Sequence, residues 1–277
     1  MQKNNMKKGP LSPDDLRAVQ LIQMEMLAEV DRICRLHNIN YTMIGGTMLG
    51  AVRHKGYIPW DDDADIGLLR EEYEKFRKVC ETDLDHDRFY FQDMRATPGY
   101  RWGYGKIRRK DTYFLREGQA HMPYESGIFI DIFPFDNVPD GKLAEKIHNL
   151  HCTIIRKILW SEVGKNIDKN LLMRGVYFLL SMIPLEMVSN HLQRFSARSN
   201  HKKSQRVRVL TFPARDNVSE GTREWYEKTF DYKFENLNLL GPESSDAYLK
   251  HKFGDYLTIP PESERKSHPV SYYKLLD

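Results

Sequence analysis

The fold is decided by one stretch of the chain, Ile44-Gly45-Gly46-Thr47-Met48-Leu49-Gly50-Ala51-Val52-Arg53-His54-Lys55-Gly56-Tyr57-Ile58-Pro59-Trp60-Asp61-Asp62-Asp63-Ala64-Asp65-Ile66. The two glycines end a short β-prone run, and residues 47–54 after them favour a short helix. Residues 63–69 then alternate as a β-strand does, with Asp63 and Asp65 on one face and apolar side chains on the other. The stretch therefore predicts a fold of the mixed α/β (α+β) class.

Four carboxylates crowd into the end of this stretch, at Asp61, Asp62, Asp63 and Asp65. Such packing is repulsive unless cations compensate it, and hard oxygen ligands suit Mg²⁺ or Mn²⁺ that bridges to phosphate oxygens. We expect Asp63 and Asp65 to hold this metal, because residues two apart in a strand point the same way. An acidic surface turn is the competing interpretation, and the apolar, strand-like residues on both sides disfavour it.

A calcium-binding loop is the sharper rival, because acids fall at its first, third, fifth and twelfth positions when the count begins at Asp61. That loop needs glycine at its sixth position, where this chain has Ile66. A helix should also precede the loop, and residues 56–60 are a poor helix. The spacing therefore favours a metal–phosphate site.

The glycines supply a second part of the expected site. Backbone N–H groups at the positive end of a helix bind phosphate, and we expect Gly45, Gly46 and Thr47 to do so. A Gly-Gly pair is often only a turn, so its weight comes from the elements around it. The order strand, Gly-Gly, helix and Asp-x-Asp strand is the nucleotidyltransferase pattern.

That pattern usually takes a third carboxylate from a later strand. Asp131 fits this position, because it alternates with isoleucines in the clearest strand of the chain, at 127–133. A satisfied acid at the end of a sheet is the competing interpretation, and Asp136 is a competing candidate.

Three basic residues are candidates for phosphate contacts, namely Arg53, His54 and Lys106. The guanidinium of Arg53 offers a fork of two donors, and Lys106 lies in a predicted strand at 102–108. A solvated surface is the competing interpretation for each basic residue, and a turn histidine is also common.

The remaining elements are ordinary. Ser12-Pro13-Asp14-Asp15 is a helix start, after which apolar residues recur at helical spacing. The C-terminal region is expected to mix short helices with polar loops. Further strands are predicted at 89–94, 112–115 and 207–212, and helices at 71–80 and over most of 140–198.

Composition excludes several classes of protein. The chain has 277 residues with 40% apolar and 29% charged side chains, which excludes a disordered chain, a fibrous repeat and a disulfide scaffold. A net charge of +3 without a recognition motif predicts no nucleic-acid partner. Cys34, Cys80 and Cys152 lack ligand spacing and predict buried thiols in a reducing compartment.

No export signal is visible, so a cytoplasmic protein is expected. The apolar run Gly175 to Leu185 has 11 residues, whereas a spanning helix needs about 20. The run predicts either a buried helix, which is the favoured interpretation, or a segment in the membrane interface. The second would make the protein peripheral at the inner face of the cytoplasmic membrane.

Three blocks of the sequence, taken together, resemble the LicD family, the phosphocholine transferases with fukutin-like relatives. They occur in order between about residues 41 and 268, and the helical middle carries no matching motif. The sequence departs from the family pattern at Gly45 and Ala64, and neither departure replaces a carboxylate. The blocks are Gly46-Thr47-Met48-Leu49-Gly50-Ala51-Val52-Arg53-His54-Lys55-Gly56 through Trp60-Asp61-Asp62-Asp63; Tyr124-Glu125-Ser126-Gly127-Ile128-Phe129-Ile130-Asp131-Ile132-Phe133-Pro134; and Phe253-Gly254-Asp255-Tyr256-Leu257 with Pro260-Pro261 and Arg265.

The resemblance implies a nucleotidyltransferase-like fold and transfer of a phospho-substituent from a CDP-activated donor, usually CDP-choline, with release of CMP. The acceptor would be a hydroxyl of a cell-surface glycan, a lipopolysaccharide or a teichoic-acid precursor, free or lipid-linked. Fukutin-type relatives transfer ribitol phosphate, so CDP-ribitol and CDP-glycerol are alternative donors. A choline donor also requires aromatic residues around its ammonium group. The candidates are Trp60, Trp102, Tyr104, Tyr113 and Tyr124.

In the expected reaction Asp63 and Asp65 hold Mg²⁺ on the donor diphosphate, and Asp131 either completes the metal site or takes the proton of the acceptor hydroxyl. Two other classes stay open, a nucleotidyltransferase that uses a nucleoside triphosphate and releases pyrophosphate, and a non-catalytic ion- or glycan-binding protein. We expect one LicD-type domain over 1–277. Its parts are a nucleotidyltransferase-like core at 12–139, a helical insertion at 140–206 and a C-terminal part at 207–277 that completes the domain.

Overall fold

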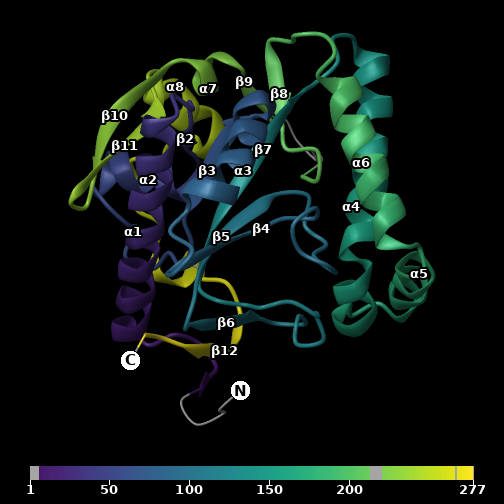
Figure 1. Cartoon of the computed structure of the whole chain (residues 1–277), viewed down its shortest axis with the longest axis horizontal. Helices are drawn as coiled ribbons and strands as arrows, with labels where there is room; N and C mark the ends of the chain where they lie inside the picture. Colours follow the sequence, from purple (N-terminus) through teal and green to yellow (C-terminus); the bar gives the residue numbers. More distant parts are fainter. Residues whose placement is uncertain (1–5, 213–219, 266, 277) are drawn as a thin grey trace.

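The computed structural model describes residues 6–212, 220–265 and 267–276, so part of the expected C-terminal unit at 207–277 lies outside the described residues (Figure 1). The first long element is helix α1, Pro13–Leu36. It begins as its sequence predicts, because the Ser12 side chain accepts a hydrogen bond from the Asp15 backbone N–H and the two acids follow at the positive end of the helix. Its apolar face is buried against the sheet.

The central sheet is mixed, with the strand order β2-β3-β7-β5-β4. Strands β3 and β7 run parallel to each other, whereas the other neighbours along this order are antiparallel. At the last two residues of β7, β8 pairs with it in the antiparallel direction, and β9 pairs with β8 in the same way. The strand bounds are β2 Thr42–Met43, β3 Asp65–Leu69, β4 Phe89–Gln92, β5 Gly105–Arg109, β7 Phe129–Asn137, β8 Arg206–Arg208 and β9 Glu220–Thr222.

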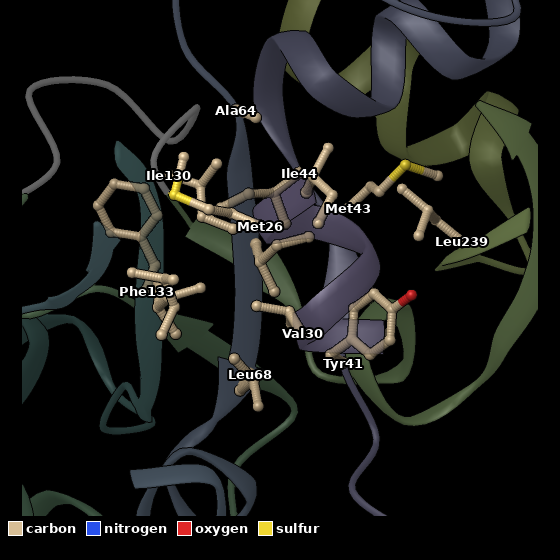
Figure 2. Close-up of a cluster of buried hydrophobic side chains, with 14 of the residues drawn as sticks. Met26, Val30, Tyr41, Met43, Ile44, Ala64, Leu68, Ile130, Phe133 and Leu239 are labelled. Carbon is tan, nitrogen blue, oxygen red and sulfur yellow. The ribbon is translucent and has the colours of Figure 1, made fainter. Parts of the chain in front are cut away.

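The hydrophobic core lies where the helices pack against this sheet. Met26 and Val30 of α1 lie beside Leu68 of β3 and Ile130 of β7 (Figure 2). Helix α3, Arg70–Asp83, adds Phe76, which is fully buried. The two strands that carry Asp65 and Asp131, β3 and β7, are therefore held rigidly by their packing in the core.

The C-terminal region contains the expected short helices and, in addition, strands that the sequence analysis did not predict. Among them, β10, Thr229–Phe234, and β11, Leu237–Pro242, form a hairpin, and β12, Val270–Lys274, lies between β1, Lys7–Lys8, and β6, Tyr113–Arg116. The hairpin carries a period-two signal, Phe230, Tyr232 and Phe234 alternating with charged residues, that the sequence interpretation missed. The short helices of this region are α7 Glu224–Glu227, α8 Ser245–Phe253 and the 3₁₀ turn Glu262–Glu264.

The expected helical segment forms three helices beside the sheet (Figure 1). They are α4 Lys142–Ile167, α5 Leu171–Ser181 and α6 Leu185–Ser199. Helices α4 and α6 share a second hydrophobic cluster that includes Cys152, Leu159, Leu192 and Phe195. The described cysteines are free and buried, as the sequence predicts.

Candidate functional site

The first wall of the candidate site is helix α2, Gly45–Arg53. Its first turn lies against the carboxylates, because a Cβ atom on Gly45 would stand 3.2 Å from Asp65 Oδ2 and one on Gly46 would overlap Asp61 Oδ2. Gly45 also has a positive φ of 54°, and its N–H donates to the hydroxyl of Tyr248 over 2.8 Å. Glycine is therefore required here by backbone conformation and by close approach.

Thr47 has a structural contact that the sequence did not predict. Its hydroxyl accepts a hydrogen bond from the Asp65 backbone N–H over 2.8 Å. This bond joins the first turn of α2 to the first residue of β3. Thr47 therefore fixes the position of Asp65, and its predicted contact with phosphate stays a prediction.

Three neighbouring strands place Asp65, Asp131 and Lys106 in one row. Asp65 of β3 is the direct partner of Asp131 on β7, and Asp131 is the direct partner of Lys106 on β5. Side chains at paired positions point to the same face of a sheet, so the three groups converge. The ammonium group of Lys106 makes an ion pair with Asp131 Oδ1 and lies 3.4 Å from the centre of the Phe129 ring.

Asp63 precedes β3 and reaches the same place from the side. Its Oδ2 atom lies 3.2 Å from the guanidinium of Arg116 on β6 and 3.3 Å from Nδ1 of His268. His268 also binds Asp62 Oδ1 through its backbone N–H and its ring. Arg116 and His268 are functional candidates that the sequence analysis missed, because only the long-range pairing of β6 with β12 brings them here.

The surroundings of this cluster disfavour the ionised form of its carboxyl groups. Burial, and then the neighbouring carboxylates, raise the pKa of Asp61 to about 8 and that of Asp65 well above its usual range. Burial also raises the pKa of Asp63. Burial lowers the pKa of Lys106 to about 7, although Asp131 beside it favours the charged form. Groups that are shifted together in this way are typical of functional sites.

The donor chemistry of the cluster suits a hard divalent cation. The carboxylates of Asp61, Asp63 and Asp65 lie together and repel one another, and Asp62 Oδ2 is buried without a hydrogen-bond partner. As the side chains stand, Lys106 and Arg116 engage Asp131 and Asp63. Within residues 6–212, 220–265 and 267–276, no group of three or more His, Cys, Asp or Glu side chains is arranged to hold a metal ion.

A cavity of about 250 Å³ adjoins the cluster. Three of its lining residues, Lys106, Arg116 and His268, also contact the carboxylates. Its other walls are largely aromatic, and two of the predicted aromatic candidates, Trp102 and Tyr104, belong to them. The combination of cations and aromatic rings fits a ligand with both phosphate and ring groups.

Three predicted candidates lie outside this row. Arg53 and His54 stand at the opposite end of α2 from Gly45, and Arg53 donates to the backbone carbonyls of Tyr256 and Thr258. Their contact with phosphate stays a prediction. Asp136, the rival of Asp131, is fully buried at the other end of β7 and accepts hydrogen bonds from Arg70, Ser196 and Asn200, which indicates a structural acid.

Two parallel strands place Asp65 and Asp131 beside a helix that begins with two glycines. This arrangement is typical of a nucleotidyltransferase-like domain. The LicD family model, described as the LicD/FKTN/FKRP nucleotidyltransferase domain, matches residues 38–153, which include the glycines, the carboxylates and Lys106. Residues 38–153 are thus similar to the domain that defines the LicD family.

A similarity over most of the chain points to the same family. Over 262 residues the chain is 28% identical to the lipopolysaccharide cholinephosphotransferase LicD of Haemophilus influenzae, and the alignment covers 92% of this chain and 96% of that protein. An uncharacterized protein of Rickettsia typhi is 40% identical over 63 residues, 23% of this chain and 20% of that protein. An uncharacterized protein of Rickettsia prowazekii is 28% identical over 120 residues, 43% of this chain and 41% of that protein.

Proposed function

We propose that this chain is a phosphotransferase that moves phosphocholine from CDP-choline to a hydroxyl of lipopolysaccharide or a related cell-surface glycan and releases CMP. The match of residues 38–153 to the LicD family model and the similarity to a lipopolysaccharide cholinephosphotransferase support this proposal. The observation that carries it is the strand register that aligns Asp65, Asp131 and Lys106 beside the first turn of α2.

Mg²⁺ or Mn²⁺ is part of the proposal, with Asp63, Asp65 and Asp131 as the residues that would hold it. When bound, the ion would neutralise charge on the donor diphosphate. The chain's own contribution is positioning, because transfer of a phosphoryl-linked group needs alignment and charge neutralisation more than covalent help. Gly46 and Thr47 would bind phosphate through backbone N–H groups at the helix start, because the N–H of Gly45 already donates to Tyr248.

Lys106 and Arg116 would bind the donor from the other side. Both cations line the cavity and already hold the carboxylates, so a diphosphate entering there exchanges one set of anionic partners for another. Arg116 offers a planar pair of donors that matches phosphate oxygens. With Arg108, these residues make the cavity cationic, which favours the diphosphate there over the choline ammonium group.

The role of the acids is tested by Asp65→Asn and Asp131→Asn, with Asp87→Asn as the matched control at an exposed position. We expect the first two variants to lose about a hundredfold or more of the metal-dependent CMP release, because each removes a charge from the reaction centre. The control should retain wild-type turnover. Near-normal turnover in the Asp65→Asn/Asp131→Asn double variant would overturn the proposal.

The donor is identified by a panel in which purified protein meets CDP-choline, CDP-ribitol, CDP-glycerol and the nucleoside triphosphates, each with lipopolysaccharide as acceptor. CMP release from CDP-choline with incorporation of phosphate into the acceptor is the expected result. CMP from another CDP compound would replace the transferred group, and pyrophosphate from a triphosphate would replace the reaction class. Metal binding without any turnover would favour a non-catalytic protein.

A further inference from the structure

Helix α5 is apolar on two sides, and only one of them is covered. Its inner side packs on α4, where Tyr177 closes on Gly164 so tightly that a Cβ atom there would lie 2.6 Å from the Tyr177 ring. Its outer side presents Leu172, Leu179 and Met182, which are 78%, 66% and 68% exposed. The helix lies at the outer edge of the molecule, away from the sheet (Figure 1).

The exposed residues form a continuous face. At 100° per residue, Leu172, Val176, Leu179 and Met182 fall within one stripe, and Leu171 and Phe178 widen it. A helix on the surface of a globular protein normally turns polar residues to this side. The outer face of α5 is therefore a large exposed apolar patch of the kind that marks an interaction surface.

Positive charge is concentrated in the same helical unit. Residues 140–203 carry eleven lysines and arginines against five acids, a net charge of +6, whereas the whole chain carries +3, so the remaining residues carry −3. No acid occurs from 169 to 185, and within this segment Lys169 and Arg174 are exposed at the border of the apolar face. The apolar face therefore has Lys169 and Arg174 beside it and belongs to a helical unit of net positive charge.

We propose that this α5 face docks on an anionic phospholipid bilayer. Apolar side chains that enter the boundary between headgroups and acyl chains, with basic residues around them, are the features of an interfacial helix. A second copy of the chain is a poorer occupant, because it would bring one +6 unit against another. Nucleic acid is poorer still, because leucine and methionine side chains offer nothing to phosphate.

The dimensions of α5 fit a position in the interface. Its 11 residues span roughly 16 Å, against a hydrocarbon core of about 30 Å. Of the helices in the described part of the chain, none is by itself long and apolar enough to cross a membrane. Helices α5 and α6 reach the required length and apolar composition only together, and the pair is bent by 85°. The apolar side chains Val188, Leu192 and Phe195 of α6 are buried in its cluster with α4, so they do not face a membrane.

Docking would bring the cavity beside the carboxylates close to the bilayer. Trp160 and Ile167 of α4 line that cavity, and Ile167 ends α4 only four residues before Leu171 begins α5. This step rests on the proposed function, because it gives a lipid-anchored glycan acceptor a short path to the site. The binding of the bilayer itself does not depend on turnover.

The test is flotation of the full-length chain with vesicles of phosphatidylcholine alone and of phosphatidylcholine with 30% phosphatidylglycerol, at about 50 mM and about 500 mM salt. We expect flotation with the anionic vesicles at low salt and about tenfold less with neutral vesicles or at high salt. Leu172→Asn/Leu179→Asn should weaken binding by about tenfold or more, because two apolar anchors are lost.

The matched control is Leu21→Asn/Leu36→Asn, which makes the same change at leucines of α1 that are 52% and 61% exposed. It should float like the wild type, and circular dichroism should show that both double variants are folded. Absence of flotation at low salt, or equal flotation of the two double variants, would overturn the proposal. So would a wild-type dimer in sedimentation that the α5 variant dissociates, since the face would then join two copies. CMP release measured without vesicles tests the proposed function separately.

Discussion

At the scale of single residues, Asp65 and Asp136 show how the same side chain can have opposite energetic roles in neighbouring strands. Asp136 is fully buried, but Arg70 grips it with two hydrogen bonds of 2.9 and 2.7 Å. Asp65 is enclosed by Asp63, Asp131 and Asp61, and burial among these acids raises its pKa well above the usual range. A paired buried acid stabilises its surroundings, whereas an unpaired one among like charges destabilises them.

The contrast predicts stability changes of opposite sign for one substitution. In a buffer with EDTA at pH 7.5, Asp65→Asn should raise the free energy of unfolding by about 1 kcal/mol, because it removes a repelled carboxylate. Asp136→Asn should lower that free energy by about 3 kcal/mol, because it leaves the half-buried Arg70 beside a neutral partner at a fully buried position. Urea denaturation of both variants measures the two values.

Adding millimolar Mg²⁺ supplies the control for that pair. An ion that binds only folded wild-type protein stabilises it by mass action, so the advantage of Asp65→Asn should shrink or reverse. The deficit of Asp136→Asn should remain, since this residue lies outside the cluster. A destabilised Asp65→Asn variant in EDTA would contradict the assignment of Asp65 to a repulsive site.

Gly46 offers a second prediction at the residue scale. Gly46→Ala should lower CMP release by about tenfold or more, because the added methyl overlaps Asp61 Oδ2 and must displace it, and displacement of a positioned group has effects of this size. The free energy of unfolding should change little, since alanine favours a helix by about 1 kcal/mol over glycine. Gly175→Ala is the matched control, because nothing lies within 4 Å of a Cβ atom there. Wild-type turnover in Gly46→Ala would contradict the close approach.

At the scale of elements, sequence pattern was sufficient where the signal is local. The cap at Ser12 and the helices around 71–80 and 140–198 depend on residues within a few positions of one another, and these elements are present. The strand expected at 63–69 is also present, but it begins at Asp65, so Asp63 lies before it. The contacts of Arg116 and His268 with Asp63 are different. They depend on the pairing of β6 with β12, more than 150 residues away along the chain, and no local pattern encodes that pairing.

Helix α4 and strand β8 are joined by a contact that should make stability depend on pH. Arg208 of β8 donates to Nδ1 of His148 over 2.9 Å, and Nε2 of His148 lies 3.1 Å from Ser199 Oγ. Burial first, and then the charge of Arg208, lower the pKa of His148 to about 4. The unfolded chain therefore binds more protons than the folded chain between about pH 6.5 and pH 4.

Stability should consequently fall as the pH falls through this window, with up to about 3 kcal/mol from His148 alone. His148→Gln should be less stable than the wild type at pH 7.5 and should flatten the decline between pH 6.5 and pH 4. His201→Gln, at an exposed position, should leave the decline unchanged. Urea midpoints across the pH range measure the difference, and parallel curves for wild type and His148→Gln would exclude the contact.

At the scale of the whole molecule, the site is closed by the last part of the chain. The Tyr248 hydroxyl accepts a hydrogen bond from the Gly45 N–H, and the His268 ring binds the Asp62 carboxylate. Two residues from the last part of the chain therefore fix the two ends of residues 44–66. Strand β12 lies between β1 and β6, and β6 carries Arg116. The carboxylates near residue 60 thus depend on residues about 200 positions later.

This closure predicts that the two termini differ in importance. Deletion of residues 269–277 removes β12, the central strand of its sheet, and should abolish CMP release and lower the free energy of unfolding by several kcal/mol. Among the described residues, deletion of 1–8 removes the edge strand β1 and the half-exposed ion pair of Lys7 with Asp15, so about 1 kcal/mol and little activity should be lost.

Because the C-terminal deletion also weakens the fold, His268→Ala separates the two effects. It removes only the ring that binds Asp62 and Asp63, and the half-exposed position tolerates alanine. We expect CMP release to fall by about tenfold, with most of the unfolding free energy retained, because the acids lose the group that orients them. Normal turnover in His268→Ala would mean that the C-terminal segment only packs against the site. Loss of turnover after deletion of residues 1–8 would contradict the predicted difference between the two termini.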